Sequence, residues 1–258
     1  CMRIGIDARM LRIDCMHGIA RYVYELIKNI VEINDSRCKY FIFVAKDFEF
    51  FNLTTSVNVN FISTDSKWLS IKEQCELSVL IKKYKIDVFH ATSFVVPYFC
   101  SCKLLVTIHD LNHLVRRKDY KLVHQLYYKM LVIPKLKKAA GVITVSEYSK
   151  KELIHKLNIP KEKISLTYNG ISNFNLFSNI EIKKTPKDFI FALASHKPHK
   201  NTLTLIRAYT ISTVNCCLVL LGTLDKKSKQ LVESYNMAKN LDSDLIYFVE
   251  DDYIHNKD

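Results

Sequence analysis

Short apolar runs alternate with amphipathic helical patterns along most of this 258-residue chain. Before residue 170 the predicted strands cover residues 3–8, 39–45, 57–62, 87–90, 104–109, 141–145 and 163–168. Between the first two strands, apolar side chains recur at i, i+3 and i+4 from Ile19 to Ile30, which places them on one face of a helix. This alternation predicts an α/β fold built on parallel sheets.

The alternation lapses once and then resumes. Residues 169–187 are rich in Asn, Ser and Lys and include Pro186, a composition typical of a linker between domains. Strands are predicted again at 189–194, 216–221 and 245–249, with a helix at 201–210. We therefore expect a first domain at residues 1–172, a linker at 173–187 and a second, incomplete domain at 188–258.

Glycine is scarce, and its spacing excludes several classes of site. The chain has 5 glycines, of which no two lie closer than 13 positions. Dinucleotide fingerprints, phosphate-binding P-loops and the nucleophile elbow of hydrolases all need closely spaced glycines. None of these three motifs is therefore present.

Neither the membrane-spanning nor the zinc-binding class fits the sequence. No apolar run approaches the roughly 18 residues of a membrane span, and residues 2–9 carry charges where a signal peptide is apolar. The 8 cysteines include no C-x-x-C pair, so the common structural zinc spacings are absent. We expect a soluble, cytoplasmic protein with free thiols, in which Cys100-Ser101-Cys102 is a weak indication of metal or redox chemistry.

Positive charge is concentrated in residues 112–138, which hold eight of the bases and a single acid in a chain of net charge +12. Leu122, Leu126, Met130 and Leu131 recur there at helical spacing, which predicts a basic amphipathic helix, bent near Pro134. Such a helix can cover a sheet, contact an anionic membrane or bind a nucleic-acid backbone. We expect a helix over a sheet, with peripheral membrane contact as the second interpretation and no nucleic-acid partner.

Candidate functional residues follow the predicted strands, because ligands of open parallel sheets bind at the carboxyl ends of strands. His109 and Asp110 follow one strand, although a histidine here is often bonded only to backbone and Asp110 can equally cap the next element. A basic segment at residues 195–201, from Ser195 to Asn201, leads into a helix start, where free N–H groups and Lys200 can bind a diphosphate. A solvated basic turn is the alternative. No dense cluster of metal ligands is present.

Several motifs together resemble a known family. They occur in order at residues 2–9, 17–22, 88–91, 106–111, 143–149, 168–171 and 197–201, the last of which is Lys-Pro-His-Lys-Asn. This set resembles the retaining family-four glycosyltransferases of the GT-B fold, in a branch similar to mannosyltransferases. The chain has His17 where many members have a second glycine, and His199 where many have arginine.

The resemblance implies two Rossmann-like domains that bind a nucleotide-sugar donor and a glycan or lipid-linked acceptor, without a cofactor or an obligatory metal. Lys200 would bind the donor diphosphate, with Ser195 and Asn201 nearby. Gly18 would let the backbone approach the donor, and His109, followed by Asp110, would face the transferred sugar. Mannose is the first expectation for the sugar, in cell-surface polysaccharide or glycolipid synthesis at the inner face of the membrane.

One departure from the family concerns its E-x7-E segment, which holds the donor and is expected downstream of residue 249. The chain ends at Asp258 without it. We therefore expect a C-terminally truncated second domain, poor donor binding and little turnover. The alternatives are a non-catalytic remnant or binding module and, less favoured, a basic nucleic-acid-binding protein.

Overall fold

The computed structural model describes residues 1–11, 18–46, 48, 56–66, 71–115, 126–170, 188–193, 201–214, 216–221 and 246–249. The chain divides into two compact units, Cys1–Ser172 and Asn173–Asp258. The predicted linker, residues 173–187, lies outside the described residues.

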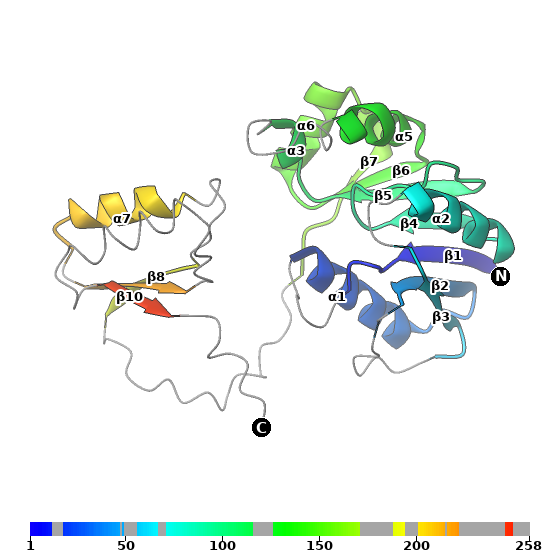
Figure 1. Ribbon diagram of the computed structural model, residues 1–258, viewed down its shortest axis with the longest axis horizontal. Coiled ribbons are helices and arrows are strands. Elements are labelled where there is room, and N and C mark those ends of the chain that lie inside the picture. Colours follow the sequence, from blue (N-terminus) through cyan, green and yellow to red (C-terminus); the bar gives the residue numbers. More distant parts are fainter. Residues whose placement is uncertain are drawn as a thin grey trace. The chain divides into compact units, whose positions relative to one another are not determined.

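The first unit is built on a seven-stranded, wholly parallel sheet (Figure 1). Its strand order is β3-β2-β1-β4-β5-β6-β7, so that β1 is in the interior of the sheet. The strands are β1 (Met2–Asp7), β2 (Cys38–Ala45), β3 (Val59–Thr64), β4 (Val88–Ala91), β5 (Lys103–Ile108), β6 (Gly141–Thr144) and β7 (Ile164–Leu166). The sheet confirms the predicted α/β class.

Helices cover both faces of this sheet. They are α1 (Gly18–Ile33), α2 (Ile71–Lys83), α3 (Asn112–Val115), α5 (Ile133–Lys138) and α6 (Glu147–Leu157), with a 3₁₀ turn at Lys161–Lys163. Helix α1 packs Val23 and Ile27 on one face, against Ile6 and Ile42. Helices α2, α5 and α6 pack on the opposite face, where they form a second apolar core (Figure 1).

The core explains Gly5 in β1. A Cβ added at Gly5 would lie 3.0 Å from the rings of both Phe43 and Phe89 and 3.2 Å from Ile86. Neighbouring strands therefore bring large side chains together over β1, and a glycine leaves the space that they fill. Packing rather than backbone conformation accounts for this glycine.

The described parts of the basic segment, residues 112–115 and 126–138, are helical, but the apolar spacing that predicted the helix does not mark its buried face. The side chains buried on the core are Tyr128, Val132 and Leu136, which recur every fourth residue. Leu126 and Met130 are 55% and 69% exposed, whereas Leu131 is partly buried against the core. Two apolar stripes run along residues 126–136, and the stripe that packs on the core is the one that contains Tyr128. Leu122 lies outside the described residues.

The predicted bend near Pro134 takes the form of a π-helical turn, Tyr128–Val132, directly before α5. In this turn the N–H of Ile133 donates to the carbonyl of Tyr128, five residues earlier. Proline has no N–H, and its ring crowds the carbonyl four residues before it. A widened turn accommodates Pro134 near the start of α5 and keeps the helical path continuous.

The second unit contains a three-stranded parallel sheet in the order β10-β9-β8. Its described elements are β8 (Phe189–Leu193), α7 (Thr202–Thr210), β9 (Cys217–Leu221) and β10 (Ile246–Val249). Ile206 of α7 packs on Leu218 and Leu220 of β9. The elements agree with the predicted strands and helix to within one residue at each start.

In the part of the chain that the structure describes, no helix is both long and apolar enough to cross a membrane.

Candidate active site

The candidate site lies at the carboxyl edge of the seven-stranded sheet, where its chain order reverses. From β1 the chain passes outward to β2 and β3 and then crosses to β4 on the other side of β1. Ligands of doubly wound sheets bind at such a switch point. Asp7 is the last residue of β1 at this edge and Arg9 lies two residues beyond it, while Thr92 and Ser93 follow β4. The topology therefore selects the ends of β1 and β4, together with the adjacent end of β5.

On the face covered by α1, three polar side chains form a connected cluster. His90 of β4 lies with its Nε2 2.8 Å from the hydroxyl of Thr107, and the hydroxyl of Tyr22 is 3.3 Å from the same oxygen. Burial lowers the pKa of His90 to about 4, against a weaker opposing effect of Asp7. His90 is therefore neutral at physiological pH, and it anchors β4, β5 and α1 to one another.

His109, at the end of β5, is held from three directions. Its Nε2 lies 3.0 Å from the carbonyl oxygen of Thr92, so this nitrogen carries a proton and donates. The ring of Tyr22 meets the imidazole edge-on at a centroid distance of 4.8 Å. Ser149 of α6 donates to the backbone carbonyl of His109 at 3.2 Å. Burial lowers the pKa of His109, which keeps the ring neutral with Nδ1 as its acceptor nitrogen.

The neighbouring candidate, Asp110, has a local structural role. Its Oδ1 accepts a hydrogen bond of 3.0 Å from the backbone N–H of Asn112, where the short helix α3 begins. This is the capping alternative that the sequence left open. The structure brings His109 and Asp110 to the same strand end, but the described contacts give the carboxylate only this backbone partner.

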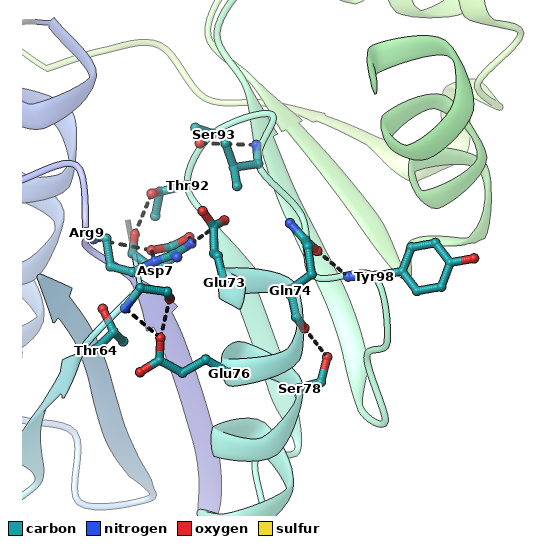
Figure 2. Close-up of polar contacts among 12 residues, drawn as sticks. Asp7, Arg9, Thr64, Glu73, Gln74, Glu76, Ser78, Thr92, Ser93 and Tyr98 are labelled. Carbon is teal, nitrogen blue, oxygen red and sulfur yellow. Dashed lines mark hydrogen bonds and ion pairs between the residues drawn. The ribbon is translucent and has the colours of Figure 1, made fainter. Parts of the chain in front are cut away.

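On the opposite face, Arg9 forms a buried ion cluster with Asp7 and Glu73 (Figure 2). Its Nε and Nη2 donate to the two oxygens of Asp7 at 2.8 and 2.7 Å, and Nη2 also lies 3.1 Å from Oε1 of Glu73. Burial alone would lower the pKa of Arg9, but the two carboxylates outweigh it and raise that pKa. The cluster joins the end of β1 to the first turn of α2.

Two further groups adjoin this ion cluster. Thr92 donates to the carbonyl of Asp7 at 2.6 Å, which links β4 to β1 at the switch point (Figure 2). Tyr127 lies nearby, and burial together with the charge of Glu73 raises its pKa to about 12. Among the described residues, Nη1 of Arg9 is buried without a hydrogen-bond partner. The cluster therefore retains one donor at the edge of the site.

Gly18 is the first residue of α1. No described atom lies within 4 Å of the place where a Cβ would stand, and its φ is not positive. Neither packing nor backbone conformation thus requires a glycine here. An open glycine at a helix N-terminus allows a ligand to approach the backbone closely.

The other predicted donor-site residues belong to the second unit. Asn201 directly precedes α7 in a left-handed conformation, with φ 55°, and its Oδ1 accepts from the hydroxyl of Thr204 at 2.7 Å. The side chain of Asn201 is thus engaged with the first turn of its own helix. Ser195 and Lys200 lie outside the described residues.

Sequence reasoning missed His90, Thr107 and Arg9 as site-building residues. The available signal was polarity within buried strands, since His90 and Thr107 interrupt apolar runs in strands covered on both faces. A buried polar side chain needs a partner, so two of them on neighbouring strands predict a contact.

Solved glycosyltransferase structures share this fold. One from Rickettsia africae matches 96% of this chain and 68% of its own, with 15% identity and a TM-score of 0.60. The structure of Anabaena HepE in complex with UDP matches 97% of this chain and 69% of HepE, with 14% identity and a TM-score of 0.61. The structure of the lipopolysaccharide outer core galactosyltransferase WaaB matches 96% of this chain and 68% of WaaB, with 12% identity and a TM-score of 0.59. The fold is therefore that of the GT-B glycosyltransferases.

The family follows from the sequence match. Residues 16–173, more than half of the chain, match the model of Glycosyltransferase Family 4, and the chain belongs to this family. It is also 25% identical over 142 residues to the O-antigen chain mannosyltransferase RfbU of Salmonella typhimurium. That match covers 55% of this chain and 36% of the relative's length.

Proposed function

We propose that this chain binds a nucleotide sugar weakly and transfers its sugar, with retention and low turnover, to a glycan or lipid-linked acceptor. The observation that carries the proposal is the family match over residues 16–173, a segment that includes Gly18, His90 and His109 of the candidate site. The resemblance to an O-antigen mannosyltransferase supports mannose as the sugar and cell-surface polysaccharide as the product.

The proposed donor site works without a metal ion. Sugar transfer leaves a nucleoside diphosphate, whose developing charge must be stabilised as the glycosidic bond breaks. Lys200 supplies a cation, and the N-terminus of α7 supplies free N–H groups directly after it. Ser195 and Asn201 flank the same anion. His109, in the first unit, is the residue that the family resemblance assigns to the transferred sugar, and Asp110 accepts a hydrogen bond in the turn that follows it.

Replacing Lys200 with Ala tests the donor site. A charge-assisted hydrogen bond contributes about 1.5–3 kcal/mol, so we expect affinity for GDP or UDP to fall by about tenfold to a hundredfold. Ligand-observed NMR with the 258-residue chain measures this even when binding is weak. Arg207→Ala, at the far end of α7, removes the same charge and should leave affinity unchanged. Equal binding by K200A and the parent chain, or no nucleotide binding by the parent chain, would contradict the proposal.

Gly18→Ala tests whether the donor approaches this glycine, because the substitution should lower donor affinity without lowering stability. The added methyl meets no described atom, and alanine favours a helix over glycine by up to about 1 kcal/mol, so stability should not fall. A close ligand would meet this methyl, at a cost of about 1–3 kcal/mol, and donor affinity should drop roughly tenfold. Gly170→Ala also adds a methyl into open space among the described residues and serves as the control. Unchanged donor affinity in G18A would exclude Gly18 from the site.

We further propose that the helical segment 126–138 contacts an anionic membrane, which places the protein at its inner face. The face opposite the buried stripe carries the exposed Leu126 and Met130. Lys129, Lys137 and Lys138 are also exposed in this segment. Apolar side chains flanked by lysines are the pattern that binds the interface of acidic lipids, and a lipid-linked acceptor is presented there.

Vesicle sedimentation tests this contact. Each lysine near an anionic surface contributes about 1 kcal/mol, so Lys129→Gln with Lys137→Gln should weaken binding to phosphatidylserine-rich vesicles about thirtyfold. Lys151→Gln with Lys161→Gln changes two exposed lysines elsewhere in the unit and should have little effect. Equal loss in both double variants, or tighter binding to duplex DNA than to vesicles, would refute a membrane-facing segment.

A further inference from the structure

Two half-buried thiols meet in the loop between β4 and β5. The Sγ atoms of Cys100 and Cys102 are 3.4 Å apart, and Sγ of Cys100 is 3.5 Å from the carbonyl oxygen of Cys102. Both side chains are partly accessible to solvent and pack against the larger core. The sulfurs are thus in contact and within reach of a small reagent.

This loop is fixed by two helices, so the contact between the sulfurs belongs to an ordered framework. The Oε1 of Gln74 in α2 accepts from the N–H of Tyr98 at 2.6 Å (Figure 2), and Ser78 donates to the carbonyl of Phe99 at 2.7 Å. From α5, Lys135 donates to the carbonyl of Tyr98 and lies 5.5 Å from the centroid of its ring.

The two thiols differ in acidity because they share one proton. The hydrogen bond from Cys102 lowers the pKa of Cys100 to about 7, against burial, and Lys135 adds to this effect. The same hydrogen bond raises the pKa of Cys102, as do burial and the negative charge of Asp87. Cys100 is therefore the nucleophile of the pair and Cys102 the proton donor.

We propose that Cys100 and Cys102 form a reversible dithiol–disulfide site that reacts with small-molecule disulfides. The Cys100 thiolate attacks one sulfur of the reagent, forming a mixed disulfide and releasing one thiolate. Cys102 then loses its proton to solvent and attacks Sγ of Cys100, which expels the second thiolate. Two protein thiols are oxidised to one disulfide, and one disulfide reagent is reduced to two thiols. The site does not depend on the proposed sugar transfer.

Oxidised glutathione with peptide mapping tests this site. We expect a peptide that contains the Cys100–Cys102 disulfide, recovered as two thiols after reduction. At pH 7 Cys100 should react about fivefold faster than an unperturbed thiol, since its larger thiolate fraction outweighs its lower nucleophilicity. The rate should rise with a midpoint near pH 7. The exposed Cys75 in the same digest is the internal reference.

Variants distinguish a reacting pair from a single reactive thiol. In Cys102→Ser the second step is removed, so glutathione should remain attached to Cys100. In Cys102→Ala the stabilising hydrogen bond is lost as well, so the midpoint of Cys100 alkylation should move to higher pH. The proposal is overturned if Cys100 reacts no faster than Cys75, or if the parent chain accumulates the mixed disulfide without the intramolecular one.

Discussion

Replacing Arg9 with Met is expected to lower the free energy of unfolding by about 3–5 kcal/mol, because it leaves two buried carboxylates without their cation. Asp7 and Glu73 are nearly inaccessible, at 5% and 0% side-chain exposure, and both pair with the same guanidinium. Methionine has a similar length and no charge, so the loss reports the ion cluster rather than a cavity. Urea denaturation followed by circular dichroism measures the change.

An exposed arginine offers the matched control. Arg37 also bonds an aspartate two positions away, but its side chain is 86% exposed. Exposed ion pairs contribute about 0–1 kcal/mol, so Arg37→Met should change stability little. A variant that also replaces Asp7 and Glu73 with Leu should recover part of the loss, because an apolar cluster needs no counter-ion. Equal losses of unfolding free energy in R9M and R37M would show that burial adds nothing to the stability of the Arg9 cluster.

The second large effect is a loss of stability in mild acid. The pKa of His90 falls from 6.5 to about 4 on folding because burial disfavours the imidazolium. Below pH 6.5 the unfolded chain therefore binds a proton that the folded chain does not, so stability decreases as pH falls toward 4. The shift corresponds to about 3 kcal/mol once pH lies below both values. His109, whose pKa is also lowered by burial, contributes in the same direction.

Unfolding curves at several pH values between 7 and 4 isolate this effect. His90→Asn keeps a polar side chain without a titrating ring, so its stability should depend less on pH than that of the parent chain. His155 is exposed on α6, and His155→Asn should leave the pH dependence unchanged. If the H90N and parent curves ran parallel across this range, His90 would not be the group responsible.

The fold was predictable because strands of a parallel sheet are covered on both faces. Continuous apolar runs such as residues 41–44 mark such strands in the sequence, and amphipathic helices between them determine the topology class. Strand β3 is displaced by two residues at both ends, since it is predicted at 57–62 and observed at Val59–Thr64. Thr64 is polar, but it pairs with Ala45 of β2, and its hydroxyl donates to the carbonyl of Val44 at 2.9 Å.

The buried face of the basic segment could not be predicted from periodicity. Leu126 and Met130 form one apolar stripe, and Tyr128, Val132 and Leu136 form another, with the same spacing of four residues. Helical spacing does not choose between two such stripes, and the π-helical turn before Pro134 changes their phase. Contact with the core determines which stripe is buried.

The site was predictable only where it depends on strand ends. His109 and Gly18 lie at the carboxyl edge, as the order of elements requires. Glu73, in contrast, stands three positions after Ser70, which is the spacing of a capping box, and nothing local indicates its ion pair with Arg9, 64 positions away. Likewise, the contact of His90 with Thr107 depends on the pairing of β4 with β5. Such partners follow from tertiary structure.

The interior position of β1 has a consequence for synthesis of the chain. Ile4, Gly5 and Ile6 pair with residues of β2 on one side and with Val88, Phe89 and His90 of β4 on the other. At about 5–20 residues per second, the ribosome makes β4 roughly 4–17 s after β1. During that time one edge of β1 has no native partner, and open strand edges are where nascent chains associate wrongly. Strand β1 is thus completed late, and the segment from β2 to α2 must be synthesised before β4 can pair with β1.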